Sequence, residues 1–223
     1  MTRRPLLSPS ILTADFARLG DEISSVASLV DWFHLDVMDG HYVDNITFGP
    51  SVVGAVRGAC SAPLHVHLMI EEPHRFAEEF ARAGATRMSF HPEVTRDPAA
   101  VIAEIRAHGV GAGIAVHPDS PLSIALPLLD SLEVIIVMSV RPGFGGQRFM
   151  PEVVPKIVAA RDAIDRAGGG VDIEVDGGVN LDTVDEVIAA GADIIVAGSA
   201  IFDGVDAPAA ARRMRERLNR AGH

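Results

Sequence analysis

The sequence predicts an α/β protein folded as a single (β/α)8 barrel, a TIM barrel, over residues 1–223. Short runs rich in β-branched residues alternate with longer amphipathic stretches along the chain. Eight such units recur at spacings of roughly 20 to 35 residues, a pattern that favours this barrel. At 223 residues and 48% apolar composition, the chain can bury one large core. A doubly wound open sheet is the architectural alternative.

The predicted strands are short and apolar, as expected of parallel strands buried on both faces. In chain order they are Leu6–Ile11, Trp32–Val37, Leu64–Met69, Arg87–Phe90, Gly111–Val116, Val134–Val140, Val171–Val175 and Ile194–Ala197.

Amphipathic stretches between these strands predict the outer helices. They are Phe16–Leu29, His74–Ala83, Pro98–His108, Pro151–Arg166 and Leu181–Ala190. Asn180 is a predicted N-cap, and Gly84 and Gly191 are predicted C-terminal caps. The links after the second and fifth strands have only weak helical patterns, and a short helix is expected after Gly198-Ser199.

Charge and composition exclude several classes of function. The net charge of −11 argues against non-specific binding of nucleic acid, which needs a basic surface. The single cysteine, Cys60, excludes an internal disulfide and a thiolate metal cluster and is typical of a reducing compartment. The start, MTRRPLLSPSILTADF, has too short an apolar run for a signal peptide, and no run approaches the roughly 18 residues of a membrane span. We therefore expect a cytoplasmic protein that binds neither nucleic acid nor membrane.

Polar residues concentrate near the predicted C-terminal strand ends, where barrels of this class place their active sites. His34 and Asp36 lie two apart on one strand, so both side chains point to the same face, and His65 and His67 repeat the spacing one strand later. Asp176 ends the seventh strand. At the barrel mouth a zinc, manganese or ferrous ion could be bound by four converging residues, His34, Asp36, His67 and Asp176. The alternative interpretation is four hydrogen-bonded structural groups. Asp39, before Gly40, is interpreted as a turn or supporting residue.

Glycine-rich segments follow the last three strands. They are Pro142–Gln147 after strand six, Gly177-Gly178 after strand seven and Gly198-Ser199 after strand eight. Backbone amides at such positions bind phosphate in this fold without a lysine. Each pair alone is typical of a simple turn, but the set favours a phosphate site, and the Pro142–Gln147 loop is a candidate lid.

Several motifs resemble the ribulose-phosphate 3-epimerase family, and the resemblance runs from about Ser8 to Phe202. The motifs are PSILTADF, FHLDVMDGHYVDNITFGP, HVHLMIEEP, VMSVRPGFGGQRFMPEVVPKI, EVDGGVN and GADIIVAGSAIF. The resemblance implies a TIM barrel that interconverts D-ribulose 5-phosphate and D-xylulose 5-phosphate with one divalent metal ion, such as zinc, iron(II), manganese or cobalt. It also implies a homo-oligomer.

Site roles are implied by the same resemblance. His34, Asp36, His67 and Asp176 would bind the metal, with Asp36 and Asp176 also acting as the two acid–base groups. Phosphate would be held by Gly145, Gly146, Gly177, Gly178, Gly198 and Ser199. Substrate would contact Ser10, His67, Met38, Met69 and Met138, although spacing alone makes the three methionines look like ordinary core residues.

The implied chemistry requires these groups. Inverting carbon 3 removes a proton from one face and returns one to the other, through an enediolate whose negative charge must be stabilised. A metal ion can do so as a Lewis acid, and carboxylates on opposite faces can exchange the roles of base and acid.

The sequence departs from the family pattern at four places, near the expected pocket rim and among the residues behind the expected site. Asp44 replaces a usual proline, Arg141 replaces a usual Glu or Asn, His65 replaces a usual acid, and His117 replaces a usual Asn before Pro118. His65 is interpreted as a packed interior histidine rather than a partner that tunes His67. These changes leave the expected reaction type in place and open the choice of sugar, so a 3-epimerase of another ketose phosphate, such as D-allulose 6-phosphate, is an alternative.

Three other functions fit part of the pattern. A metal-dependent hydrolase would release phosphate or cleave a bond, and a lyase or aldolase would give a shorter aldehyde. A phosphosugar-binding barrel without turnover would bind its ligand and leave the carbon 3 proton in place.

Overall fold

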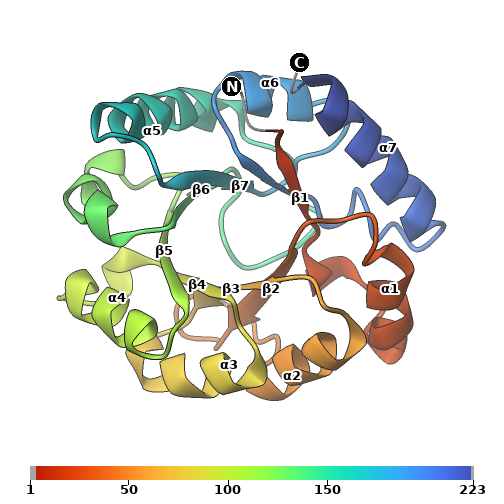
Figure 1. The fold of residues 1–223 in the computed structure, drawn as a ribbon, viewed down its shortest axis with the longest axis horizontal. Coiled ribbons are helices and arrows are strands. Elements are labelled where there is room, and N and C mark those ends of the chain that lie inside the picture. The colour runs from red at the N-terminus through yellow and green to blue at the C-terminus, as the bar shows by residue number, and fades with distance from the viewer. Residues whose placement is uncertain (1–3, 222–223) are drawn as a thin grey trace.

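Eight parallel strands form a nearly closed barrel with helices around its outside (Figure 1). The computed structural model describes residues 4–221. The strands are β1 (Leu6–Ser8), β2 (Phe33–Met38), β3 (Leu64–Met69), β4 (Arg87–Phe90), β5 (Gly111–Val116), β6 (Val134–Met138), β7 (Asp172–Asp176) and β8 (Ile194–Val196). Their order is β1-β8-β7-β6-β5-β4-β3-β2, and an isolated parallel bridge between Ser10 and His34 lies at the β1–β2 seam. The predicted barrel is confirmed, and the open sheet is wrong.

Strand boundaries agree closely with the sequence prediction, and the largest difference is at β1. This strand ends at Ser8 because the next residues, Ile11–Thr13, form a 3-10 helix. Ser10 is its N-cap, and its side chain accepts a hydrogen bond from the Leu12 amide. The turn carries the chain away from the barrel and leaves Ser10 beside His34 at the mouth.

Seven α-helices and several 3-10 helices are described. The α-helices are α1 (Leu19–Val26), α2 (Pro50–Ala59), α3 (Ala77–Ala83), α4 (Pro98–Ala107), α5 (Val154–Arg166), α6 (Val184–Ala189) and α7 (Ala207–Ala221). The 3-10 helices are Ile11–Thr13, Phe16–Arg18, Pro73–Phe76, Pro92–Val94, Leu122–Ile124, Leu126–Ser131 and Pro151–Val153. The weak helical pattern after the fifth strand is confirmed, because that link holds only 3-10 helices among the described elements.

Three helix predictions need correction. The link after β2 contains a full helix, α2, whose two internal glycines weaken its pattern. The segment after Gly198 is a turn rather than a short helix, with the Gly198 carbonyl accepting from the amides of Ile201 and Phe202. Asn180 is not the N-cap of α6, which begins at Val184; its side chain instead accepts from the Asp182 amide in a local turn.

The glycine caps are confirmed where a left-handed backbone is needed. Gly84 follows α3 with φ of 103°, and Gly191 ends the α6 turn with φ of 109°. Side chains with a β-carbon rarely adopt this conformation, so these glycines let the chain turn directly into β4 and β8.

The barrel interior is divided between apolar and polar side chains. Ala115, Ile136, Met138 and Val140 form a small apolar cluster on the β5–β6 side, separate from the large core between strands and helices. Paired residues on parallel strands share a face, and Met138 is paired with Asp176. Buried polar side chains occupy the rest of the interior, on β1, β2, β3, β4 and β7, and Asp176 on β7 lies beside Met138.

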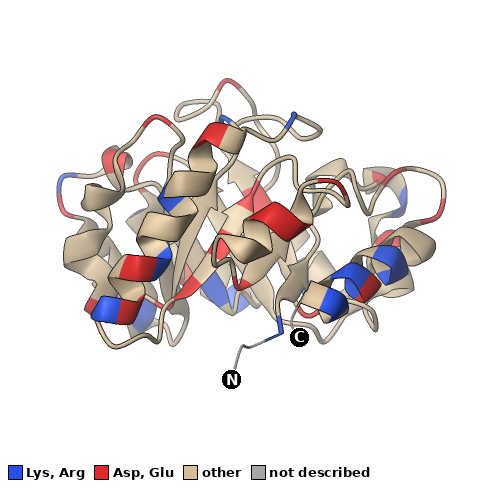
Figure 2. Cartoon of the chain, turned by 90° about the horizontal axis from the view of Figure 1, so that it is seen from above, with Lys and Arg blue, Asp and Glu red and all other residues tan. Residues whose placement is uncertain are grey.

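Charged residues lie mostly on the outer helices and the connecting loops, and both signs occur on the helices (Figure 2). Among residues 4–221, no helix combines the length and apolar character that crossing a membrane requires.

Candidate metal centre and active site

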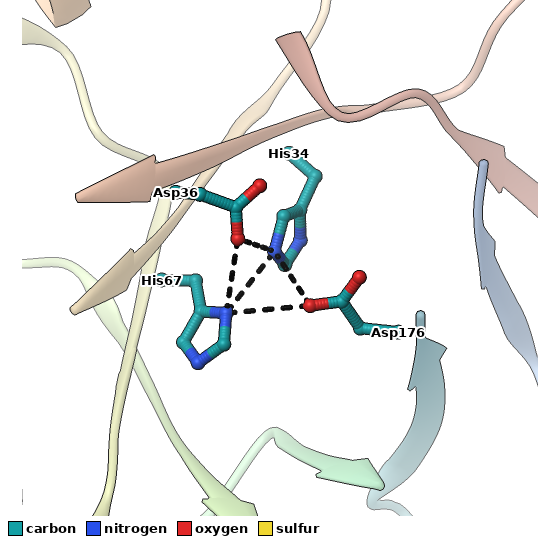
Figure 3. A group of neighbouring side chains, drawn as sticks. All are labelled: His34, Asp36, His67 and Asp176. Atoms are coloured by element: carbon teal, nitrogen blue, oxygen red, sulfur yellow. Dashed lines mark hydrogen bonds and ion pairs between the residues drawn. The ribbon is translucent and has the colours of Figure 1, made fainter. Parts of the chain in front are cut away.

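Four side chains from three strands meet at the barrel mouth (Figure 3). On β2, His34 and Asp36 point inward because Phe33, Leu35 and Val37 alternate with them toward the helices. His67 on β3 is paired with Asp36 in the register of these neighbouring strands. Asp176, at the end of β7, reaches them from across the barrel.

The nitrogen and oxygen atoms of this cluster are spaced like the ligands of one metal ion. His34 Nε2 lies 3.2 Å from Asp36 Oδ1, 3.3 Å from His67 Nδ1 and 3.6 Å from Asp176 Oδ2. His67 Nδ1 lies 3.3 Å from Asp36 Oδ1 and 3.5 Å from Asp176 Oδ2. Ligand atoms about 2.0–2.1 Å from a tetrahedral centre are about 3.3–3.4 Å apart. Two imidazole nitrogens and two carboxylate oxygens therefore fit a small divalent cation.

The two carboxylates make this buried cluster a favourable place for a positive charge. Both imidazoles are fully buried, and the two aspartates are almost so. Burial lowers the pKa of His34, but the charges of Asp36 and Asp176 outweigh it and leave that pKa well above its usual value. Burial raises the pKa of Asp36, but the charge and hydrogen bond of His34 reverse the shift, so the carboxylate stays ionised.

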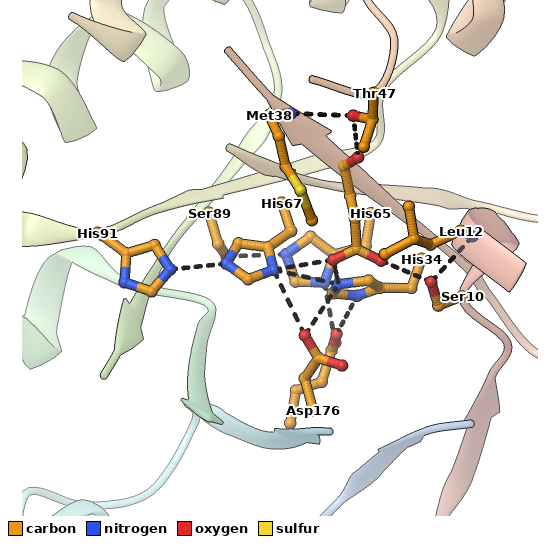
Figure 4. Close-up of polar contacts among 12 residues, drawn as sticks. Ser10, Leu12, His34, Met38, Thr47, His65, His67, Ser89, His91 and Asp176 are labelled. Carbon is orange, nitrogen blue, oxygen red and sulfur yellow. Dashed lines mark hydrogen bonds and ion pairs between the residues drawn. The ribbon is translucent and has the colours of Figure 1, made fainter. Parts of the chain in front are cut away.

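Asp36, His34 and His67 each have a polar partner outside the cluster (Figure 4). Asp36 Oδ2 accepts a hydrogen bond from Ser10 Oγ at 2.5 Å. His34 Nδ1 lies 2.7 Å from Glu174 Oε1, and His67 Nε2 lies 3.0 Å from His91 Nε2. These contacts fix the rotamers of the cluster before any ligand arrives.

A cavity opens above the cluster and collects most of the predicted site residues. Of these residues, those that line it are Ser10, Asp36, Met38, Met69, Met138, Asp176, Gly145, Gly146, Gly177, Gly178, Gly198 and Ser199. The imidazoles of His34 and His67 lie beneath this surface and are fully buried. Both carboxylates thus face the cavity, while the histidines support them from below.

The glycines of the cavity wall allow close approach of backbone to backbone. Gly178 has φ of 67°, and a β-carbon there would lie 2.3 Å from the Phe149 amide nitrogen. A residue other than glycine would force apart the loops after β6 and β7. Exposed amides at such turns suit an oxyanion ligand.

The loop Pro142–Gln147 covers one side of the cavity and is tied to its neighbours. Asn45 Nδ2 donates to the Gly143 carbonyl at 2.7 Å, and Gln147 Nε2 donates to the carbonyls of Arg141 and Phe144. Arg141 also pairs with Asp119 at 3.1 Å on the surface.

Three departures from the family pattern share a second hollow beside this loop. Asp44, His117 and Arg141 line it, together with Tyr42 and Glu93. The fourth departure, His65, lies deep in the barrel and bonds to Glu174 and Ser89 rather than to His67. Asp39, as expected, is a turn residue; it accepts from the amides of His41, Tyr42 and Glu71.

Sequence reasoning missed residues of two kinds. Thr13 lines the cavity because of a loop path that no periodicity encodes, and within residues 4–221 its buried Oγ1 has no hydrogen-bond partner. Glu174 was within reach of prediction, because it precedes Asp176 by two on the same strand, as His34 precedes Asp36. His91, just past β4, is visible only through its contact with His67.

Fold and site together define a (β/α)8-barrel enzyme whose two carboxylates, backed by two histidines, face one cavity at the C-terminal ends of the strands. The sequence model of the ribulose-phosphate 3 epimerase family matches residues 6–202. The chain belongs to the ribulose-phosphate 3-epimerase family.

Relatives at moderate identity support this assignment. A ribulose-phosphate 3-epimerase of Mycobacterium bovis is 49% identical over 94% of this chain and 91% of its own. One from Escherichia coli K12 is 44% identical over 98% of both chains.

Solved structures at low identity share the fold. A KGPDC from Streptococcus mutans, solved in complex with D-R5P, matches with a TM-score of 0.77 at 17% identity, covering 98% of this chain and 99% of its own. An orotidine 5'-phosphate decarboxylase from Pyrococcus horikoshii OT3 matches with a TM-score of 0.72 at 16% identity, covering 96% of this chain and 99% of its own.

Proposed function

We propose that the chain inverts carbon 3 of D-ribulose 5-phosphate to give D-xylulose 5-phosphate, with Asp36 and Asp176 as the proton-transfer groups. The names of its relatives support the reaction. The observation that carries the mechanism is the placement of these two carboxylates, which face one cavity from β2 and from β7 across the barrel.

Two carboxylates on different sides of the substrate are what an inversion needs. One removes the proton of carbon 3, and the other delivers a proton to the opposite face of the planar intermediate. In the reverse direction the roles exchange. The Ser10 hydroxyl donates a hydrogen bond to Asp36 Oδ2, which leaves Asp36 Oδ1 facing His34 in the cluster. A single carboxylate would return the proton to the face it left.

His34, Asp36, His67 and Asp176 would hold one divalent metal ion, and their spacing and mixed donors fit zinc, iron(II), manganese or cobalt. When bound, the ion supplies a Lewis acid that stabilises negative charge developing on the substrate oxygens. The two imidazoles lie below the cavity floor, so we assign them to ligation rather than to proton transfer.

The substrate phosphate would be held by the backbone amides of Gly145, Gly146, Gly177, Gly178, Gly198 and Ser199, all of which line the cavity. Amides can bind a dianion without a lysine. A structural neighbour crystallised with D-R5P supports a sugar phosphate as the ligand. Met38, Met69 and Met138 would provide an adaptable apolar wall for the sugar.

A second ketose phosphate is favoured by one observation. Arg141 begins the loop that covers the cavity, and its pairing with Asp119 joins that loop to the segment after β5. A change at this rim could alter the length of sugar accepted, so a six-carbon substrate such as D-allulose 6-phosphate is the second candidate.

The proposal is tested by NMR in deuterated water with a panel of ketose phosphates. We expect D-ribulose 5-phosphate to give D-xylulose 5-phosphate with deuterium at carbon 3, faster than any six-carbon ketose phosphate reacts. Free phosphate would indicate a hydrolase, and a shorter aldehyde would indicate a lyase. Tight binding without exchange at carbon 3 would indicate a binding protein, and each of these results would overturn the proposal.

A further inference from the structure

A second layer of buried polar side chains lies two residues earlier on the strands, because Glu174 precedes Asp176 on β7 and His65 precedes His67 on β3. Figure 4 shows His65 and Ser89 close to His34 and His67. Glu174 on β7 is 1% exposed, and its two oxygens face two different imidazoles. Oε1 lies 2.7 Å from His34 Nδ1, and Oε2 lies 2.8 Å from His65 Nδ1. His65 Nε2 in turn lies 2.8 Å from Ser89 Oγ. A charged group this deep is tolerated only where its hydrogen bonds are complete.

The chemistry of these atoms fixes where the hydrogens are. An ionised carboxylate only accepts hydrogen bonds, so both Nδ1 atoms facing Glu174 must carry hydrogen. His34 in its neutral form then has no hydrogen on Nε2, and this is the nitrogen that faces Asp36, His67 and Asp176. His65 likewise presents a bare Nε2, which accepts a hydrogen bond from the Ser89 hydroxyl.

We infer that Glu174 and His65 are positioning residues of the metal centre: Glu174 holds His34 in the tautomer that can bind a metal ion, and His65 holds Glu174 by supplying its second donor. The inference deepens the proposed function and rests on its metal site. Neither residue lines the cavity, so both would act through His34.

The second metal-ligand histidine lacks such an anchor. His67 Nε2 faces His91 Nε2, and an imidazole can donate or accept. The tautomer of His34 is therefore imposed by the charge of Glu174. Removing that charge should weaken metal binding more than any substitution of His91, the partner of His67.

His65 has a dedicated place in the barrel. A β-carbon at Gly113 would lie 2.3 Å from Ser89 Oγ, so glycine on β5 leaves room for the hydroxyl that completes the chain from Glu174 through His65. The terminal hydroxyl can rotate to donate, which satisfies both nitrogens of His65.

A second metal ion among His34, His65 and Glu174 is the competing explanation. Two ligands of one tetrahedral ion stand about 3.3 Å apart, whereas these nitrogen–oxygen distances are 2.7 and 2.8 Å. Such lengths are those of charge-assisted hydrogen bonds. The geometry points to hydrogen bonding at this level and to metal binding only above it.

The experiment compares zinc affinity, by competition with a chromophoric chelator, in the full chain and four variants. Glu174→Gln keeps the shape but offers one acceptor and one donor, so we expect zinc to bind about 10- to 100-fold more weakly. We expect His65→Leu to weaken zinc binding about tenfold, because Glu174 then loses its second donor. His65→Asn should recover most of that loss, since its amide stands near the Nδ1 position. Glu216→Gln, exposed on α7, is the matched control and should equal wild type.

Melting temperatures in the presence of chelator separate positioning from a structural role. A structural role would lower the melting temperature of Glu174→Gln and leave its zinc affinity at the wild-type value, and that result would overturn the inference. If Glu174→Gln does not fold, the His65→Leu and His65→Asn pair decides; equal zinc affinities in both would overturn it.

Epimerase activity of the wild type is measured separately. A wild type that binds zinc without epimerising any ketose phosphate overturns the proposed reaction, while the inference stands if the affinities follow the expected order. A wild type that epimerises, with unchanged zinc affinity across the folded variants, overturns the inference alone.

Discussion

Replacing Asp176 with asparagine should separate proton exchange from inversion. Asp176 Oδ2 lies 3.6 Å from His34 Nε2 and 3.5 Å from His67 Nδ1, and asparagine keeps the side-chain shape while removing the charge and the proton-transfer group. Asp36 and its Ser10 hydrogen bond are left in place. The variant therefore retains one of the two carboxylates that face the cavity.

The expected loss of epimerisation is at least about a hundredfold, the low end for a missing general acid or base, or about 2.7 kcal/mol of transition-state stabilisation. Weaker metal binding adds to this, because a neutral amide would replace one of the two charged ligands of the divalent ion. Saturating the variant with metal removes that second contribution, so the remaining loss reports proton transfer.

The assay incubates each pentulose 5-phosphate separately with the variant in deuterated water and follows carbon 3 by NMR. Because Asp36 remains, one epimer should take up deuterium with its configuration retained, and the other should neither exchange nor invert. Inversion of either epimer within tenfold of the wild-type rate, with metal saturating, would refute the assignment of Asp176.

Metal removal, glycine substitution and acid titration test other features of the same site. Dialysis against a chelator should abolish epimerisation, and adding back zinc, manganese, cobalt or iron(II) should restore it; activity that survives complete metal removal, checked by elemental analysis, contradicts the metal site. Gly178→Ala should lower the free energy of unfolding by about 2 kcal/mol or more in urea titrations, because the added β-carbon would meet the Phe149 backbone. Gly20→Ala in α1 is the control and should be neutral or stabilising, because a β-carbon there would contact no other part of the fold within 4 Å. Burial lowers the pKa of His65 and of His91 to about 4, against about 6.5 in the unfolded chain. The unfolded state of the chelated protein thus binds more protons between pH 6.5 and 4, so its stability should fall as pH drops, by up to about 1.4 kcal/mol per pH unit for each histidine. His91→Gln should reduce that slope, and an unchanged slope would show that His91 is not buried as the neutral form.

The positions of the inward-facing groups were predictable because a strand has a period of two. His34 with Asp36, and His65 with His67, share faces by spacing alone, and the fold class sets which end of the strands forms the site. What spacing could not supply was the register between β2 and β3, which pairs Asp36 with His67, or the closure of the barrel that brings Asp176 to them.

Features that depend on loop geometry lay beyond the sequence. The segment after Gly198 is predicted to be helical, but it is a turn. The Gly198 carbonyl accepts hydrogen bonds from the amides of Ile201 and Phe202, and the chain then continues to α7. Thr13 enters the cavity only because the 3-10 helix capped by Ser10 redirects the chain. Helix α2 has glycines at two internal positions, and its stability comes from packing of Val53 and Val56 rather than from intrinsic propensity.

His65 shows why a departure from a family pattern is best interpreted through its contacts. An acid is usual at this position, and an acid here would place a second carboxylate against Glu174, where one of the two would have to hold a proton. The imidazole instead donates to Glu174, which leaves Glu174 free to remain ionised between two donors. Burial raises the pKa of Glu174, but the imidazoles of His65 and His34, which each face one of its oxygens, lower that pKa below its usual range. The substitution at His65 therefore acts on His34 rather than on His67, through a carboxylate that lies between the two imidazoles.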